Sequence, residues 1–87
     1  MYRFNFTNEG NKSLSNLPFE IISRIKTKII WLAENASIIP HLKLKGDEFK
    51  NMYKLRIGDY RIIYELDNPN KLITIIKVGH RKNIYKI

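Results

Sequence analysis

The second half of the chain contains three consecutive runs of β-branched and aromatic residues, and these constrain the fold more than any other feature. The runs span residues 52–57, 60–67 and 72–80. Turn-forming residues separate them, first Gly58-Asp59 and then Asn68-Pro69-Asn70-Lys71. Short strands joined by such turns form consecutive β-hairpins. The sequence therefore predicts an antiparallel sheet in the C-terminal half of the molecule.

The first half of the chain carries a different pattern. Residues 2–6 alternate apolar and polar side chains, which predicts a half-buried strand. A short helix is expected next, with Thr7 or Asn8 as its cap. Apolar residues then recur at steps of three and four over residues 18–35, which predicts a longer helix. The apolar stripe of that helix consists of Ile22, Ile25, Ile29, Leu32, Ala33 and Ala36.

The remaining segments are short. Residues 42–45 predict an edge strand after a proline-containing connector, and residues 81–87 are expected to run out along the edge of the sheet. Apart from the short edge strand, these elements give the order β-α-α-β-β-β over a single domain, residues 1–87. We therefore expect an α+β fold in which two N-terminal helices pack on one face of a small, antiparallel-rich β-sheet.

Length and composition exclude several classes of protein. A chain of 87 residues builds one small core, because only about 60% of the unfolded surface leaves water. Without cysteine there are no disulfides and no cysteine-based zinc site, and His41 and His80 cannot fill a zinc shell alone. The sequence has no cofactor motif and no apolar run long enough to cross a bilayer. We expect a cytoplasmic protein without metal, other cofactor or membrane contact.

The positive charge is concentrated in the second half of the chain. The formal net charge is +8, and residues 42–87 hold eleven Lys and Arg against five Asp and Glu, which gives +6. A cation placed on a phosphate group releases a condensed counterion, so such a charge distribution is typical of proteins that bind polyanions. A lysine-rich surface that is simply solvated is the alternative.

The first hairpin determines where its cations lie. A two-residue loop at Gly58-Asp59 pairs Arg56 with Arg61, and alternation along the strand places Lys54 on the same face. The other face is apolar. Like charges on neighbouring strands destabilise a sheet, so this arrangement favours a bound anion such as phosphate. Glu65 on the same face could instead neutralise part of the charge.

The end of the chain adds cations and a phenol. Arginine suits bidentate phosphate contact, and an aromatic ring such as Tyr85 can stack on a base, although Tyr85 could equally be a packing residue. Whether Lys77 joins the cationic face depends on the register of the last hairpin. The candidate RNA-binding residues are Lys54, Arg56, Lys77, Lys82 and Lys86.

Two segments together resemble a known protein family. Residues 53–65 read YKLRIGDYRIIYE and residues 78–85 read VGHRKNIY. These runs resemble the core and the C-terminal end of RelE-type toxins in the RelE/ParE superfamily, and the predicted order of elements fits that family over nearly the whole chain. The resemblance implies the toxin of a type II toxin–antitoxin pair, an mRNA interferase that enters the ribosomal A site and cuts the mRNA there. Its expected partners are a cognate antitoxin, the ribosome and mRNA.

The resemblance also assigns catalytic roles. Lys54 and Arg56 match the paired strand cations of the family, although some members have lysine where Arg56 stands. Arg61 matches the central transition-state arginine. Arg81 and Tyr85 match the C-terminal catalytic pair.

The resemblance thus implies a metal-independent endoribonuclease in which the 2′-hydroxyl group attacks the adjacent phosphate. Tyr85 is the candidate base, although an isolated phenol loses its proton only near pH 10. A guanidinium group stays protonated, so Arg81 is expected to stabilise the leaving group by its charge. With such weak acid–base groups, we expect slow cleavage of free RNA and dependence on the ribosome for geometry. His80 is expected to pack against the protein, and a ribonuclease built from His41 and His80 is the less favoured enzyme.

Two other functions remain open. A ParE-like member of the same superfamily would inhibit DNA gyrase through protein contacts without cutting RNA. The third possibility is a catalytically inactive module that binds RNA or an antitoxin.

Overall fold

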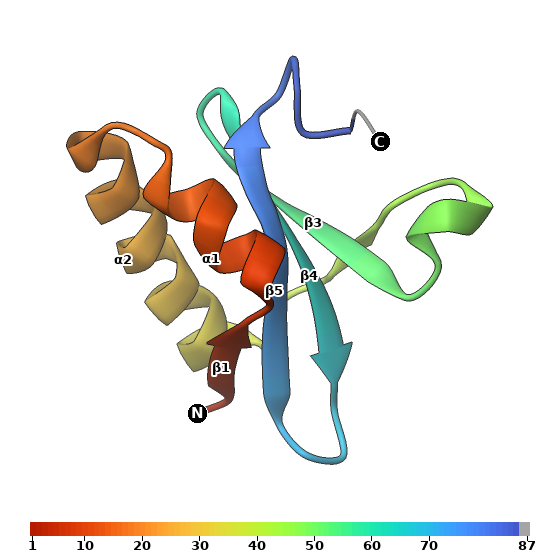
Figure 1. Cartoon of the computed structure of the whole chain (residues 1–87). Coiled ribbons are helices and arrows are strands. Elements are labelled where there is room, and N and C mark those ends of the chain that lie inside the picture. The colour runs from red at the N-terminus through yellow and green to blue at the C-terminus, as the bar shows by residue number, and fades with distance from the viewer. Residues whose placement is uncertain (86–87) are drawn as a thin grey trace.

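Two helices pack against one face of a five-stranded sheet in the computed structural model, which describes residues 1–85 apart from the side chain of Glu48 (Figure 1). The strands are β1 (Arg3–Phe6), β2 (Leu42–Lys43), β3 (Met52–Ile57), β4 (Tyr60–Asp67) and β5 (Leu72–His80). The helices are α1 (Asn8–Ser15), α2 (Phe19–Asn35) and the single 3-10 turn η1 (Asp47–Phe49). The predicted fold class and the predicted order of elements are confirmed, and the three C-terminal strands begin and end where the sequence predicts.

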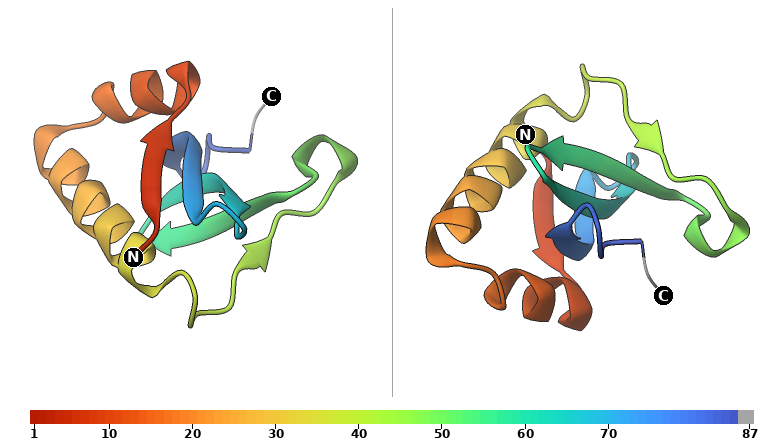
Figure 2. Two further views of the ribbon diagram at one scale, coloured as in Figure 1. Left: turned by 90° about the horizontal axis from the view of Figure 1, so that it is seen from below. Right: turned by 90° about the horizontal axis from the view of Figure 1, so that it is seen from above.

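The strands lie in the order β1-β5-β4-β3-β2. The pairs β2–β3, β3–β4 and β4–β5 are antiparallel, whereas β1 runs parallel to β5. The parallel pair requires a crossover, because the two helices and the rest of the sheet come between β1 and β5 in the sequence. The helices of this crossover lie together on one side of the sheet (Figures 1 and 2).

Local residue chemistry accounts for the start of α1 and for its close contact with the sheet. Thr7 caps the helix, since its side-chain oxygen accepts a hydrogen bond from the backbone N–H of Gly10 at 2.9 Å. A side chain at Gly10 would run into the backbone carbonyl of Ile75 in β5. Glycine at this position therefore lets α1 lie directly on the sheet.

The core lies between α2 and the sheet. From the predicted apolar stripe of α2, Ile25, Ile29 and Leu32 are almost completely buried, whereas Ile22 is half-buried. The sheet contributes Ile62, Tyr64, Ile73, Ile75 and Val78 to the same cluster. Within residues 1–85, no helix is long and apolar enough to span a membrane.

A partly buried hydrogen-bonded pair, His41 and Tyr64, links the connector after α2 to the core. The Nε2 of His41 lies 2.7 Å from the carbonyl oxygen of Ala36, and its Nδ1 lies 2.6 Å from the hydroxyl of Tyr64. A carbonyl only accepts hydrogen bonds, so Nε2 carries a proton, and in the neutral ring Nδ1 accepts from the Tyr64 hydroxyl. Burial raises the pKa of the Tyr64 phenol well above its ordinary value, and the neighbouring Tyr53 phenol raises it further.

We predict that Tyr64→Phe lowers the free energy of unfolding by about 1–2 kcal/mol at neutral pH, because Nδ1 of His41 loses its donor. This difference should shrink above about pH 10. There the unfolded wild-type chain loses the phenol proton while the folded chain keeps it, which destabilises the wild type by up to about 1.4 kcal/mol per pH unit. Urea unfolding of both proteins at pH 7 and pH 10.5 measures the difference, with Tyr2→Phe as the surface control. A difference that is constant with pH would contradict the prediction.

Residues 81–85 do not run out along the edge of the sheet, so that expectation is wrong for them, while residues 86–87 lie outside the described residues. After β5, the N–H groups of Asn83 and Ile84 both donate to the carbonyl of His80 at 2.9 Å, which turns the chain back. Ile84 is only 2% exposed, and its side chain lies over Gly79. Because Gly79 has no side chain, it leaves a space on the sheet that Ile84 fills, and burial of this apolar group favours the turn.

Candidate nucleic-acid interface

The hairpin register places the strand cations on the face of the sheet that the helices leave uncovered, which we call the outer face. Arg56 pairs with Arg61, as the sequence predicts, and Arg61 pairs in turn with Gly79. The neighbouring row joins Lys54, Ile63 and Lys77. The outer face therefore carries two adjacent rows that cross β3, β4 and β5.

A β-bulge determines the position of Lys77. The β4–β5 pairing shifts between Ile63 and Tyr64, so that Ile63 lies opposite Lys77 while Tyr64 lies opposite Ile75. Ile76 is thus an extra residue on β5. Strict alternation from the buried Ile75 would turn Lys77 toward the core, but the extra residue turns it to the outer face.

Arg61 is held in place by the turn that it follows. One terminal nitrogen of its guanidinium group, Nη1, donates to the carbonyl of Gly58 at 2.8 Å and to the carbonyl of Tyr60 at 2.9 Å. Gly58 has a φ of 54°, which suits the first position of a tight hairpin turn. The two carbonyls use both N–H groups of Nη1 and leave those of Nε and Nη2 for another acceptor. The group is therefore preorganised to bind an anion.

The same turn holds Arg81. Its backbone N–H donates to the carbonyl of Asp59 at 2.7 Å, and its Nε lies 3.6 Å from Oδ1 of Asp59. Both side chains of this ion pair are more than half exposed, so the pair contributes little stability and can exchange for a phosphate group. The turn thus brings the guanidinium groups of Arg61 and Arg81 to the same end of the sheet.

Tyr85 follows directly on the residue that covers Gly79. The backbone of Ile84 lies over Gly79, the cross-strand neighbour of Arg61, and Tyr85 is one Cα step further. The Tyr85 ring is 38% exposed and meets the ring of Phe49 edge-on, with 6.5 Å between centroids and 77° between planes. Figure 2 shows the C-terminal segment on the side of the sheet away from α2.

The remaining cations differ in their surroundings. Arg56 is exposed and Lys54 half-buried, and neither pairs with a carboxylate among the side chains that the structure describes, which do not include that of Glu48. Glu65 forms no ion pair with a described side chain either, so it does not neutralise the strand cations in the way the sequence allowed. Lys82 is exposed beside the turn, whereas Lys86 lies outside the described residues.

The two histidines do not form a site. His80 pairs with Tyr60 on the helix side of the sheet, where the two rings meet at 5.4 Å, so the expected packing role of His80 is confirmed. His41 contacts Tyr64, which is four residues, or about 13 Å, further along the same strand. In the part of the chain that the structure describes, no cluster of His, Cys, Asp or Glu could hold a metal ion.

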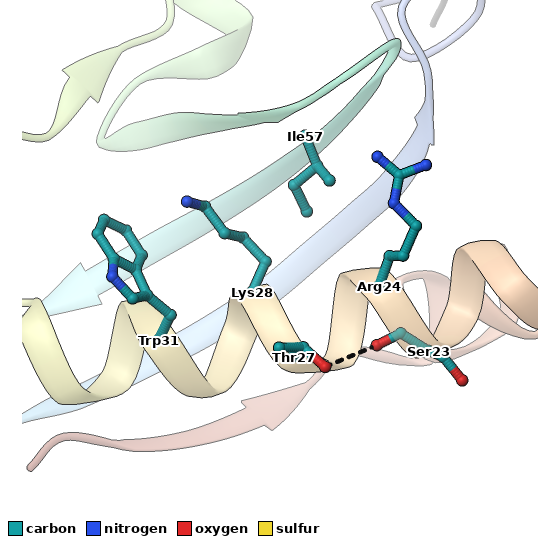
Figure 3. A pocket seen from close by; sticks show the side chains of 6 residues that line it. All are labelled: Ser23, Arg24, Thr27, Lys28, Trp31 and Ile57. Atoms are coloured by element: carbon teal, nitrogen blue, oxygen red, sulfur yellow. Dashed lines mark hydrogen bonds between the residues drawn. The ribbon is translucent and has the colours of Figure 1, made fainter.

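Sequence reasoning missed Arg24. A Cβ atom placed on Gly58 would lie 3.3 Å from the guanidinium Nη2 of Arg24, a residue of α2. A third arginine therefore reaches the β3–β4 turn. Arg24 also lines an open groove of about 450 Å³ between α2 and Ile57 of β3 (Figure 3). In this groove the Lys28 ammonium group lies 3.8 Å from the centre of the Trp31 ring. The only signal in the sequence is that Arg24 lies off the apolar stripe of its helix.

Comparison with known proteins identifies close relatives of this chain. A family model described as the ParE toxin of the type II toxin–antitoxin system parDE matches residues 6–85. Toxin RelE3 of Methanocaldococcus jannaschii is 38% identical over 77 residues, which cover 85% of this chain and 84% of the relative.

Solved structures show the same architecture. The RelB–RelE antitoxin–toxin complex of Methanococcus jannaschii contains a chain that is 31% identical, with a TM-score of 0.66 and coverage of 92% of this chain and 93% of that one. The toxin–antitoxin complex RelBE2 of Mycobacterium tuberculosis contains a chain with a TM-score of 0.81 and coverage of 92% and 98%. Its sequence identity is 23%, so this second likeness concerns the fold.

Proposed function

Since this chain belongs to the RelE/ParE superfamily and is a toxin of the type II toxin–antitoxin class, we propose that it is a ribosome-dependent endoribonuclease that cuts mRNA and so inhibits translation. The observation that carries the proposal is the cationic row of the outer face. Arg56 and Arg61 lie opposite one another there, without a carboxylate partner among the described side chains, and the segment that ends in Tyr85 turns back over the same row.

The proposed reaction is an attack of a ribose 2′-oxygen on the adjacent phosphorus. Tyr85 takes the proton of the 2′-hydroxyl group, the new P–O bond forms, and the bond to the 5′-oxygen breaks. The products are a 2′,3′-cyclic phosphate and a 5′-hydroxyl end, and the departing oxygen takes its proton from water. The protein supplies all the charge that this step needs from its own side chains.

Each cation has a place in this scheme. Lys54, Arg56 and Arg61 hold the phosphate group and stabilise the additional negative charge of the transition state. Arg81 stabilises the departing 5′-oxygen by its charge. Further along the RNA, the proposed backbone contacts are Lys77, Lys82 and Lys86.

The dependence on the ribosome follows from the size and shape of the site. The outer face is one side of a five-stranded sheet in a chain of 87 residues. In-line attack requires the 2′-oxygen, the phosphorus and the leaving oxygen to be aligned, and this alignment provides much of the rate. In the proposed function the ribosome provides it.

The proposed partner in the resting state is a cognate antitoxin. Several structurally similar chains were solved as toxin–antitoxin complexes, from Mycobacterium tuberculosis, Pyrococcus horikoshii and Methanococcus jannaschii. A basic toxin surface favours an antitoxin with an acidic or amphipathic binding segment.

Induction of the protein in growing cells, followed by mapping of mRNA 5′ ends, tests the proposal. We expect cuts within translated codons that disappear when translation initiation is blocked. The description of the matching family names parDE, so inhibition of DNA gyrase is the second candidate function. Intact mRNA together with double-strand DNA breaks would support gyrase inhibition. If neither appears, the chain is an inactive binding module.

A further inference from the structure

We propose that Phe49 is a positioning residue for Tyr85, an inference that rests on the proposed function. Phe49 has no polar atom in its side chain, so it takes no part in proton transfer or phosphate binding. Its ring and the Tyr85 ring meet edge-on, with 6.5 Å between centroids and 77° between planes, although the two residues are far apart in the sequence. In the proposed reaction Phe49 holds the phenol at the outer face.

The backbone of the C-terminal turn is fixed independently of Phe49. The carbonyl of His80 accepts from the N–H groups of Asn83 and Ile84, and Ile84 is buried over Gly79. These contacts fix the chain up to residue 84. They leave the two side-chain torsions of Tyr85 undetermined, and a phenol that rotates freely spends little time near a 2′-hydroxyl group.

The ring of Phe49 supplies the missing restraint. Aromatic rings prefer an edge-to-face arrangement with centroids 4.5–7 Å apart, and the Phe49–Tyr85 pair at 6.5 Å and 77° falls in that range. Tyr85 is 38% exposed, so part of its surface is covered and the rest can meet RNA.

Phe49 is itself held by a folded loop. Its N–H donates to the carbonyl of Gly46 at 3.1 Å within η1, and the N–H of Leu44 donates to the carbonyl of Met52 at 3.0 Å across the base of the loop. Asn51 takes a φ of 64°, a left-handed conformation that turns the chain into β3. The loop therefore connects Tyr85 to the strand that carries Lys54 and Arg56.

Single-turnover cleavage of mRNA on purified ribosomes tests this role. We expect Phe49→Leu to lower the maximal cleavage rate by about 2- to 10-fold, which is the effect expected from the loss of one aromatic pair. The ribosome concentration that gives half the maximal rate should stay unchanged, because Phe49 carries no charge. Phe49→Tyr should restore most of the rate, since it keeps the ring. Phe19→Leu, at an 81% exposed aromatic in α2, is the control and should cut at the wild-type rate.

The ring contact has a readout of its own. In the NMR spectrum of the full chain, the Tyr85 ring protons should carry a ring-current shift that Phe49→Leu removes and Phe49→Tyr retains, with Tyr85→Phe assigning the signals. If Phe49→Leu keeps both the shift and the wild-type rate, the inference is wrong while the proposed function stands. If the wild-type protein cuts no mRNA, the proposed function is wrong, and the spectrum alone decides whether the two rings are in contact.

Discussion

Replacement of Arg61 by alanine is expected to slow the cleavage of ribosome-bound mRNA by about 10²–10³-fold, the usual effect of removing one preorganised donor to transition-state charge. The carbonyls of Gly58 and Tyr60 fix the guanidinium group before RNA arrives, so none of its orientation has to be established during the reaction. Single-turnover rates on programmed ribosomes measure the effect.

Two further variants separate this role from a general effect of charge. Arg61→Lys keeps the charge but is expected to recover only part of the rate, because an ammonium group cannot bond both carbonyls and still present a planar pair of donors to phosphate. Lys12→Ala removes an exposed cation from α1, on the helix side of the sheet, and should leave the rate unchanged. An Arg61→Ala protein that cuts at the wild-type rate would remove Arg61 from the mechanism.

Replacement of Tyr85 by phenylalanine is expected to lower the cleavage rate by about 10²–10⁴-fold, the usual contribution of a positioned acid–base group. The substitution removes one oxygen and keeps the ring, so the edge-on contact with Phe49 and the burial of Ile84 remain. The loss should therefore appear in the maximal rate and leave the affinity for the ribosome unchanged. The same single-turnover assay, with a binding titration alongside, makes this distinction.

An unchanged rate for Tyr85→Phe would mean that the ring stacks on a base and takes no proton. In that case Tyr85→Ala should still weaken binding, because base–aromatic stacking is sequence-tolerant and worth about 1–3 kcal/mol. The pair of variants thus decides between proton transfer and stacking.

The elements and the first hairpin could be predicted because their signals are local. Alternation, turn residues and helical spacing give the three C-terminal strands and α2, and a two-residue loop at Gly58 leaves only one register for Arg56 and Arg61. The cationic row followed from these signals together with the net charge.

The rest of the candidate site depends on tertiary contacts that no local pattern contains. Ile75 and Ile76 are both apolar, so the sequence does not show which of them is the extra residue. Nor does it show that Ile84 fills the space over Gly79 or that Phe49 meets Tyr85, since these contacts join segments that lie far apart or turn back on themselves. Arg24 reaches the turn because of how α2 crosses the sheet.

The bulge at Ile76 gives β5 one residue more than its pairing with β4 requires. Deletion of Ile76 would place Lys77 directly after Ile75, and strict alternation would then keep Lys77 on the outer face and Val78 in the core. Gly79 would still face Ile84. The strand can therefore lose a codon at this position without exchanging its hydrophobic interior for its polar surface.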